Sequence, residues 1–309
     1  MSTPPFPSDP HSPDLPSTGP TGSSGPSGTT PTKGDVRLAV VTGASAGVGR
    51  AIAVGFGTLG WTVALGARRL DRLEETAAAV VEAGGTPWVH ALDVTDERSV
   101  DTFFGDLERD LHPRVADVLV NNAGLGYLGA VAEITAERLR AMIDTNLVGV
   151  LLCTKRATAA MLGQGVPGDV VFISSDSVQK AYPHMLTYGA TKAAVEHLAA
   201  GLDVELGGTG IRVSVVRLGP TVSEFNTSWD DADMIAFMQA WERLGITDDF
   251  NYIPAEAAAS AVVQAVTVPK GTKLSIVSIR PETTIADDAR AKWANAANQG
   301  RSADGAGAR

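Results

Sequence analysis

The sequence predicts an α/β fold, a doubly wound, seven-stranded parallel sheet with helices on both faces. Short apolar runs rich in β-branched residues alternate with segments of helical periodicity through most of the chain. A glycine-rich stretch directly after the first apolar run is typical of a strand, a tight turn and a helix. With 309 residues, 44% of them hydrophobic, the chain can form one large α/β domain or two small ones.

The first strand, turn and helix are expected between Val36 and Gly60. The turn has the spacing Gly-x-x-x-Gly-x-Gly, which differs from the common dinucleotide fingerprint Gly-x-Gly-x-x-Gly. Glycine permits a positive φ and a close approach of phosphate, and a helix beginning there would direct unpaired N–H groups at that phosphate. A glycine turn without a ligand is the alternative. The expected phosphate contacts are Gly43, Ser45, Gly47, Val48 and Gly49.

The same alternation predicts the remaining elements. Further strands are expected at residues 61–65, 87–92, 118–120, 168–173, 211–216 and 274–279. Further helices are expected at residues 70–83, 95–111, 135–161, 187–206 and 256–268. Residues 222–254, rich in aromatic residues and methionine, are expected to form an inserted lobe.

The domain organisation predicted is a leader (1–34), one α/β domain (35–280) and a loosely ordered tail (281–309). The leader holds nine of the 17 prolines and few large apolar residues, so it cannot bury enough surface to offset its ordering entropy. We expect it to be disordered, with a proline-rich docking segment as the alternative. It lacks the basic start and apolar centre of a secretory signal.

Charge and cysteine content argue against several functional classes. The net charge of −10 argues against general binding to nucleic acid or to an anionic membrane, and no run reaches the ~18 apolar residues of a membrane span. Cys153 is the single cysteine, so neither an intrachain disulfide nor a cysteine metal cluster can form, and no metal site is expected. Its apolar surroundings favour a buried inert thiol over a nucleophile. Together these features predict a cytoplasmic protein.

Arg68 and Arg69 follow the second predicted strand. In a nucleotide-binding βαβ unit an acidic residue at this position binds the ribose 2′-hydroxyl, whereas arginine accommodates a 2′-phosphate. Two arginines without the acid favour NADP(H) over NAD(H). The alternative is a pair of solvated arginines that form ion pairs with Asp71, Glu74 or Glu75 of the following helix.

Polar residues also follow the third and fourth predicted strands, at the edge where open α/β sheets bind ligands. The carboxylate of Asp93 is expected to accept from an adenine amino group or to cap the next helix. The paired asparagines after the fourth strand are expected to bind neighbouring backbone beside the cofactor. The cofactor contacts expected here are Asp93, Val94, Asn121, Ala123 and Gly124.

Tyr188 and Lys192 lie four residues apart on one predicted helix, so their side chains share a face. An ammonium ~4 Å from a phenol, in an effective dielectric of ~20, would favour phenolate by about 4 kcal/mol, or roughly three pKa units. That pair would bring the phenol near working pH, where it can exchange protons. The helix follows the fifth strand, whose end carries Ser175. Asn146 lies among apolar residues of another helix, where it is either a satisfied core amide or a kink that holds a water.

In this order and spacing, Thr42 to Gly49, Asn121 to Gly124, Asn146, Ser175 and Tyr188-x-x-x-Lys192 resemble a single-domain short-chain dehydrogenase/reductase over residues 35–279. The resemblance implies a Rossmann-type fold and four catalytic residues. Tyr188 would be the acid in reduction and the base in oxidation, and Ser175, thirteen residues earlier, would bind the substrate oxygen. Lys192 would bind the nicotinamide ribose and lower the pKa of Tyr188, while Asn146 would hold the relay water.

Further cofactor contacts implied by the resemblance are Gly219, Thr221 and Ser223, although Leu218, Gly219 and Pro220 replace the usual Pro-Gly, and Ser223 replaces a usual threonine. The expected activity is NADP(H)-dependent hydride transfer to or from a carbonyl or secondary alcohol. A catalytically silent NADP(H)-binding regulator and an enzyme that uses nicotinamide transiently are the alternatives.

The expected partners are a small carbonyl or alcohol substrate, bulky or apolar if the aromatic residues of the lobe form its wall, and a second copy of this chain. Those aromatic residues could equally be lobe core or subunit contact. Apolar faces at residues 147–161 and 195–206 favour a homodimer or homotetramer.

Overall fold

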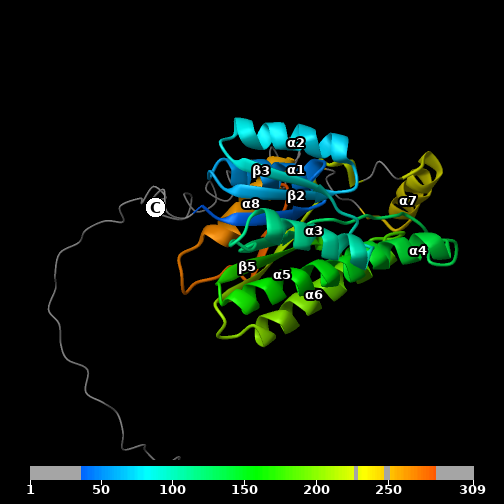
Figure 1. Ribbon diagram of the computed structural model, residues 1–309. Helices are drawn as coiled ribbons and strands as arrows, with labels where there is room; N and C mark the ends of the chain where they lie inside the picture. Colours follow the sequence, from blue (N-terminus) through cyan, green and yellow to red (C-terminus); the bar gives the residue numbers. More distant parts are fainter. Residues whose placement is uncertain (1–35, 226–228, 247–250, 283–309) are drawn as a thin grey trace, which may run out of the picture. The chain divides into compact units, whose positions relative to one another are not determined.

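The structure is a computed structural model that describes residues 36–225, 229–246 and 251–282. Within these residues seven parallel strands form one sheet in the order β3-β2-β1-β4-β5-β6-β7. Figure 1 shows this sheet between two layers of helices. From β1 the strand order runs to β2 and β3 on one side, and to β4 and the later strands on the other. This change of side leaves a crevice for ligands at the carboxyl ends of β1 and β4. The strands are β1 Leu38–Thr42, β2 Thr62–Ala67, β3 Thr86–Ala91, β4 Val118–Asn121, β5 Gly168–Ser175, β6 Ile211–Leu218 and β7 Ile276–Ile279.

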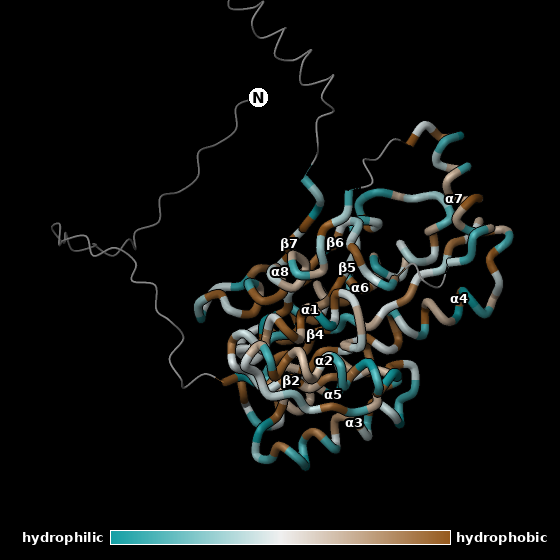
Figure 2. Tube along the Cα trace, turned by 90° about the horizontal axis from the view of Figure 1, so that it is seen from above, coloured by the Kyte–Doolittle hydropathy of each residue, from teal (hydrophilic) through white to brown (hydrophobic). Residues whose placement is uncertain are grey.

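Helices cover both faces of the sheet, as predicted, because successive residues of each strand point to opposite sides. In β1, Ala39 and Val41 pack into the core beneath α1, α2 and α8, while Leu38 and Val40 pack into the core beneath α3, α5 and α6. Figure 2 shows the mostly hydrophobic central strands between these two layers. The helices are α1 Gly47–Gly57, α2 Leu70–Glu82, α3 Glu97–Asp110, α4 Ala136–Ile143, α5 Gly149–Gln164, α6 Leu186–Glu205, α7 Asp231–Arg243 and α8 Ala255–Thr267.

A third, smaller apolar cluster lies outside the two sheet cores. Leu128, Phe237 and Trp241 are buried together, and α7 carries the last two. Arg138 of α4 forms ion pairs with Asp233 at 2.7 Å and Asp230 at 3.4 Å, which anchors α7 beside α4. The described part of the predicted lobe therefore has its own core.

The opposite edge of the sheet carries a buried ionic cluster. Asp169 of β5 is 2% exposed and pairs with Arg212 of β6 at 2.7 Å and with Arg37, just before β1, at 2.6 Å. Arg37 also contacts Asp117, just before β4, at 2.7 Å. These pairs join four neighbouring strands at their amino ends.

The structure corrects three predicted details. The helix expected over residues 135–161 is α4 and α5 joined by a π-helical segment, Asp144–Val148, which contains Asn146. Strands β5 and β6 extend two residues further than predicted, because each pairs with the other to Ser175 and Leu218. Helix α3 is capped by Asp96 rather than Asp93.

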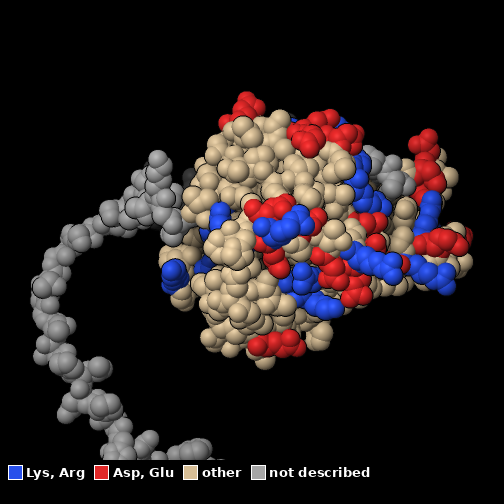
Figure 3. Space-filling view, in the orientation of Figure 1, with Lys and Arg blue, Asp and Glu red and all other residues tan. Residues whose placement is uncertain are grey.

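The predictions for the leader, the tail, membrane spans and surface charge can be compared with the structure only over the described residues. The leader (1–34) and most of the tail (281–309) lie outside them, so both remain predictions. No helix in the described ranges is long and apolar enough to cross a membrane. On the face shown in Figure 3, basic and acidic side chains are interspersed.

Candidate active site

The glycine turn after β1 is closely packed against the loop after β4. Gly43 and Gly47 have φ values of +67° and +51°, a region that favours glycine. A Cβ on Gly49 would collide with the carbonyl oxygen of Gly43. The Thr42 hydroxyl accepts from the Asn122 and Ala123 N–H groups, both at 3.0 Å. Ala46, the N-cap of α1, has no side-chain oxygen that could accept a hydrogen bond from the first N–H groups of this helix. Its side chain therefore leaves these N–H groups available at the crevice.

A cavity of about 950 Å³ extends from this turn, across the carboxyl ends of the strands, to the aromatic residues of the lobe. The structure brings nearly all the predicted site residues to its wall. Those that line it are Gly43, Ser45, Gly47, Val48, Gly49, Arg68, Arg69, Asp93, Val94, Ala123, Gly124, Ser175, Tyr188, Lys192, Gly219, Thr221 and Ser223.

Asn121, predicted as a cofactor contact, does not line the cavity. Its side chain is buried and donates to Thr154 Oγ1 of α5 at 3.0 Å. The neighbouring Asn122 lines the cavity and donates from Nδ2 to the Thr42 carbonyl at 2.9 Å. Asn121 is the last residue of β4 and its side chain points to the α5 side of the sheet, whereas Asn122 follows the strand and reaches the glycine turn.

Tyr188 and Ser175 meet at the middle of the cavity. Ser175 is the last residue of β5 and Tyr188 lies in the first turn of α6, and their side chains are close enough for Ser175 to act on the pKa of the phenol. Ser175 Oγ accepts from the Ser177 N–H at 3.2 Å and donates to Asp176 Oδ1 at 3.4 Å, and these bonds help to hold its side chain. Both hydroxyl groups are therefore held where one carbonyl oxygen could bind them together.

Lys192 and Asn146 lie beside this pair. Lys192 Nζ donates to the Ile173 carbonyl at 2.9 Å and lies 5.8 Å from the centre of the Tyr188 ring. A Cβ on Gly124 would lie 3.3 Å from Asn146 Oδ1 and 3.5 Å from Lys192 Nζ, so both groups flank this glycine. The four predicted catalytic residues thus gather near the middle of the cavity, although Asn146 is fully buried behind its wall and does not line it.

The Asn146 amide is a satisfied core amide, one of the two expected alternatives. Oδ1 accepts from the Leu125 N–H at 2.9 Å, and Nδ2 donates to the Leu125 carbonyl at 2.8 Å and to Thr191 Oγ1 at 3.1 Å. The π-helical segment widens the helix at this point, as expected of a local irregularity. The water of the second alternative remains a prediction.

The structure contradicts the predicted pKa of Tyr188. Burial raises the pKa of the phenol to about 12, and this effect exceeds the opposing hydrogen bond from Ser175. Burial also lowers the pKa of Lys192 to about 8, because an ammonium is costly to desolvate. The prediction counted the attraction between the two groups and omitted the cost of burying each of them. At neutral pH the phenol is protonated and ready to donate.

The lowered pKa of Lys192 predicts how stability depends on pH. Between about 8 and 10.5 the unfolded chain keeps a proton on this amine that the folded chain has lost, so the free energy of unfolding rises with pH. We expect a rise of about 2–3 kcal/mol from this group. Lys192→Met removes the amine, so urea denaturation at pH 7.5 and 10 should show a smaller rise for the variant. Equal rises in both proteins would contradict the assignment.

The arginines after β2 contact residues far away in the sequence. Arg69 pairs with Glu224 at 3.0 Å and donates to Ser45 Oγ at 3.2 Å. Among the acids considered as alternative partners, Glu75 pairs with Arg72 instead. The Asp93 carboxylate accepts from Thr95 N–H at 3.0 Å and from its hydroxyl at 2.7 Å. Burial opposes ionisation of Asp93, but these bonds and the charge of Arg68 together lower its pKa.

Comparisons with known proteins agree with this geometry. A family model described as "short chain dehydrogenase" matches residues 37–233. The chain belongs to this family. Among its relatives, sulfoacetaldehyde reductase 2 of Chromohalobacter salexigens is 31% identical over 247 residues, which cover 79% of this chain and 94% of that protein. Glycine betaine reductase ATRR of Emericella nidulans is 32% identical over 245 residues, but the match covers 19% of that longer protein.

A solved structure supports the same family. The closed form of serine dehydrogenase complexed with NADP+ matches with a TM-score of 0.69 and 27% identity, covering 81% of this chain and 97% of that chain. The chain is therefore an oxidoreductase with the Rossmann-type fold of the short-chain dehydrogenases.

Among the described residues, no group of three or more His, Cys, Asp or Glu side chains could hold a metal ion.

In this short-chain dehydrogenase, Ser174 and Ser175 have different contacts. Ser174 Oγ donates to Glu196 Oε1 of α6 at 2.6 Å, and Glu196 pairs with Arg217 of β6 at 2.6 Å. Ser175 faces Tyr188. The serine selected by its separation from the tyrosine is thus the one that lies against it, while its neighbour ties β5 to α6.

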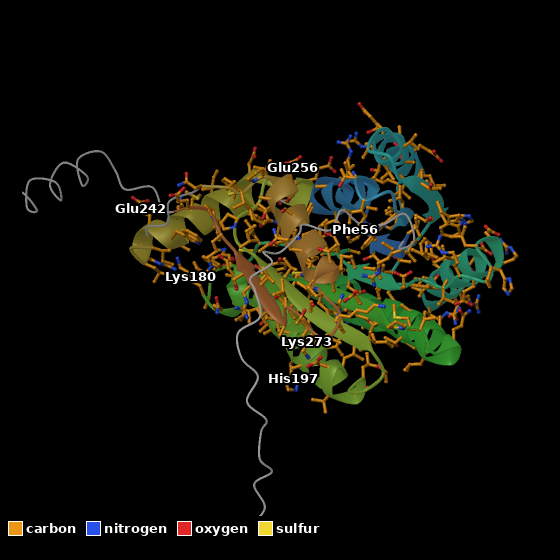
Figure 4. All side chains as sticks on the ribbon, turned by 90° about the vertical axis from the view of Figure 1, so that its left-hand side faces the viewer. Phe56, Lys180, His197, Glu242, Glu256 and Lys273 are labelled. Carbon is orange, nitrogen blue, oxygen red and sulfur yellow. The ribbon has the colours of Figure 1, made fainter. Side chains whose placement is uncertain are left out.

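The lobe extends the cavity with aromatic rings, for which the sequence left open a role as cavity wall, lobe core or subunit contact. The Phe225 ring lies 5.0 Å from that of Tyr188 and 5.8 Å from that of Trp229, whose indole N–H donates to the Gly126 carbonyl at 2.8 Å. Phe237 and Trp241 are buried in the lobe core, although both also reach the cavity wall. Figure 4 shows Lys180, which also lines the cavity, at the same end of the molecule as Glu242 of α7.

Proposed function

We propose that this short-chain dehydrogenase transfers a hydride between NADP(H) and a small carbonyl or secondary alcohol, with Tyr188 as the acid and base. The observation that carries the proposal is that Tyr188 and Ser175 lie beside one another at the wall of a cavity that begins at the glycine turn. A small relative, sulfoacetaldehyde reductase 2, is named for a carbonyl substrate, and serine dehydrogenase was solved with NADP+.

The chain's own residues fit a dinucleotide. Gly43, Gly47 and Gly49 of the turn line the cavity without side chains, and the N-terminus of α1 lies directly after Ala46. Ser45 and Arg69 converge at the end of β2, where a hydroxyl and a guanidinium suit a 2′-phosphate. Arg68 lines the same part of the cavity. This set of donors supports NADP(H) over NAD(H).

The bound nicotinamide would supply the hydride. Ser175 and Tyr188 would both hydrogen-bond the substrate oxygen and polarise its carbonyl. As the carbon accepts the hydride, the phenol O–H bond breaks and its proton passes to the developing alkoxide, which leaves an alcohol and a phenolate. Lys192 would stabilise the phenolate through its charge, and Asn146 would hold a water through which the phenol regains its proton. Oxidation runs the same steps in reverse.

A direct assay tests this proposal. A panel of aldehydes and ketones with NADPH should produce a loss of absorbance of the reduced cofactor, together with the corresponding alcohol. Tight binding of NADPH without turnover of any compound would favour a silent regulatory protein. Product formation without net consumption of cofactor would favour an epimerase or dehydratase. Either result would contradict the proposed activity.

The cofactor preference predicts a selective effect of the two arginines. In the double variant Arg68→Ala with Arg69→Ala, the dissociation constant of NADPH should rise by about 10–100-fold, because a doubly charged phosphate loses its donors. The dissociation constant of NADH should change by less than about threefold. Titration of cofactor fluorescence measures both constants, and equal changes would reject the contact with the 2′-phosphate.

We also propose that the chain forms a homodimer or homotetramer and acts in the cytoplasm. Leu151 on α5 and Val204 on α6 are 42% and 81% exposed, on the helices whose apolar faces were expected to pair. The lone thiol, Cys153, is buried, and burial raises its pKa to about 12, which suits a chain without disulfides. Light scattering after size exclusion tests the assembly, and a monomer would contradict it.

A further inference from the structure

We propose that Glu224 sets the balance between NADP(H) and NAD(H), because its carboxylate occupies the anion site that a 2′-phosphate would need. This inference rests on the proposed function. The chain would then carry its own competitor for the phosphate, the Glu224 carboxylate in the loop between β6 and α7.

The contacts of Glu224 define an anion site. Oε2 lies 3.0 Å from Arg69 Nη1, and Oε1 lies 3.2 Å from Arg72 Nη2. The second Nη of Arg69 donates to Ser45 Oγ at 3.2 Å, so one guanidinium joins the carboxylate to the glycine turn. Two guanidinium groups that share one oxyanion are the arrangement expected for a phosphate. Arg72, which the sequence analysis did not select, is therefore the second arm of this site.

Contacts on both sides hold the loop that carries Glu224 at the cavity wall. Thr221 forms a parallel bridge with Ile253, and its hydroxyl donates to the Gly219 carbonyl at 2.8 Å. The Ser223 side chain lies against the glycine turn, since a Cβ on Gly47 would be 3.1 Å from Ser223 Cβ. Glu224 follows directly and meets the arginines of the other wall. The carboxylate thus lies at the end of the cavity that Arg69 and Ser45 line, where the 2′-phosphate of a dinucleotide would lie.

The exposure of these groups makes the contact exchangeable. The side chains of Arg69, Arg72 and Glu224 are 50%, 42% and 40% exposed, so water screens both ion pairs. A 2′-phosphate carries more charge and more acceptor oxygens than one carboxylate, so it can displace Glu224 from the arginines. NAD(H) lacks this phosphate and can bind while Glu224 stays in place. The competition therefore weakens the binding of NADP(H) alone.

The test removes the charge of Glu224 and keeps its shape. Calorimetry on the full chain would give dissociation constants for NADPH, NADH and 2′,5′-ADP, a probe that carries the 2′-phosphate without nicotinamide. In Glu224→Gln the constants of NADPH and 2′,5′-ADP should fall by about 3–10-fold, while that of NADH should change by less than about twofold. The gain should shrink at high salt, since the competing pairs are exposed.

Glu75→Gln is the matched control, because Glu75 contacts Arg72 at 3.0 Å and its loss changes the net charge equally. It should tighten NADPH binding less than Glu224→Gln does. Unchanged or weaker NADPH binding by Glu224→Gln, an equal gain for NADH, or an equal gain in the control would overturn the inference. A wild-type protein that binds NADH but not 2′,5′-ADP would overturn the NADP(H) preference itself, and the wild-type titrations alone show this.

Discussion

Tyr188→Phe is expected to lower kcat for carbonyl reduction by about 10²–10⁴-fold, the usual contribution of a general acid. The substitution removes one hydroxyl and keeps the ring, which packs 5.0 Å from Phe225, so the cavity should keep its shape. Ser175 would remain as a donor to the substrate oxygen, but it cannot replace the proton. The dissociation constant of NADPH should stay within about twofold of the wild-type value.

Tyr182→Phe is a matched control for that experiment. Tyr182 lines the same cavity, and its hydroxyl donates to Asp176 Oδ2 at 3.0 Å. The control loses the same atom at a position that reaches Ser175 indirectly, through Asp176, so its kcat should change far less. Steady-state kinetics on both variants decide between the roles. A Tyr188→Phe enzyme with wild-type turnover would reject the assignment of Tyr188 as the acid.

Asp169→Ala is expected to lower the free energy of unfolding by about 3–5 kcal/mol. Asp169 accepts from Arg212 Nε at 2.7 Å and Nη2 at 3.0 Å, and it also pairs with Arg37. Its removal leaves two guanidinium groups without their shared carboxylate at the base of the sheet. Chemical denaturation with guanidinium chloride measures the loss.

Asp203→Ala provides the comparison for Asp169→Ala. Asp203 of α6 also pairs with a basic residue, Lys273, but both side chains are more than one-third exposed. The loss from an exposed pair is about 0–1 kcal/mol. If Asp169→Ala costs no more than Asp203→Ala, the buried cluster does not stabilise the sheet as inferred.

The fold could be predicted because its signals are local and repeated. Each strand is a short apolar run, and each covering helix has an apolar stripe, so the alternation predicts a parallel sheet without any knowledge of contacts. The position of Tyr188 followed from the same signal, since the chain order places α6 directly after β5. The sequence offered an irregular helix at Asn146 only as one of two alternatives. One extra residue in a helical turn leaves the apolar pattern nearly unchanged, so the pattern could not decide between them.

The parts of the site that the sequence did not predict depend on distant residues. Glu224 and Arg69 are 155 positions apart, and Asp169 and Arg212 are 43 apart, so no local pattern joins them. The direction of the Tyr188 pKa shift was also missed, because it depends on how deeply the phenol is buried. Asn121 was assigned to the cavity because it follows the predicted strand 118–120, but it is the last residue of β4, and the pleat of the strand directs it to α5.

The separate apolar cluster of Leu128, Phe237 and Trp241 has a consequence for substitutions in the lobe. Because these side chains do not belong to either core of the sheet, mutations that rebuild the cluster leave the packing around β1 and β5 intact. Substitutions around α7 can therefore reshape the lobe end of the cavity, where Phe237 and Trp241 form the wall, without disturbing the two layers that hold the sheet.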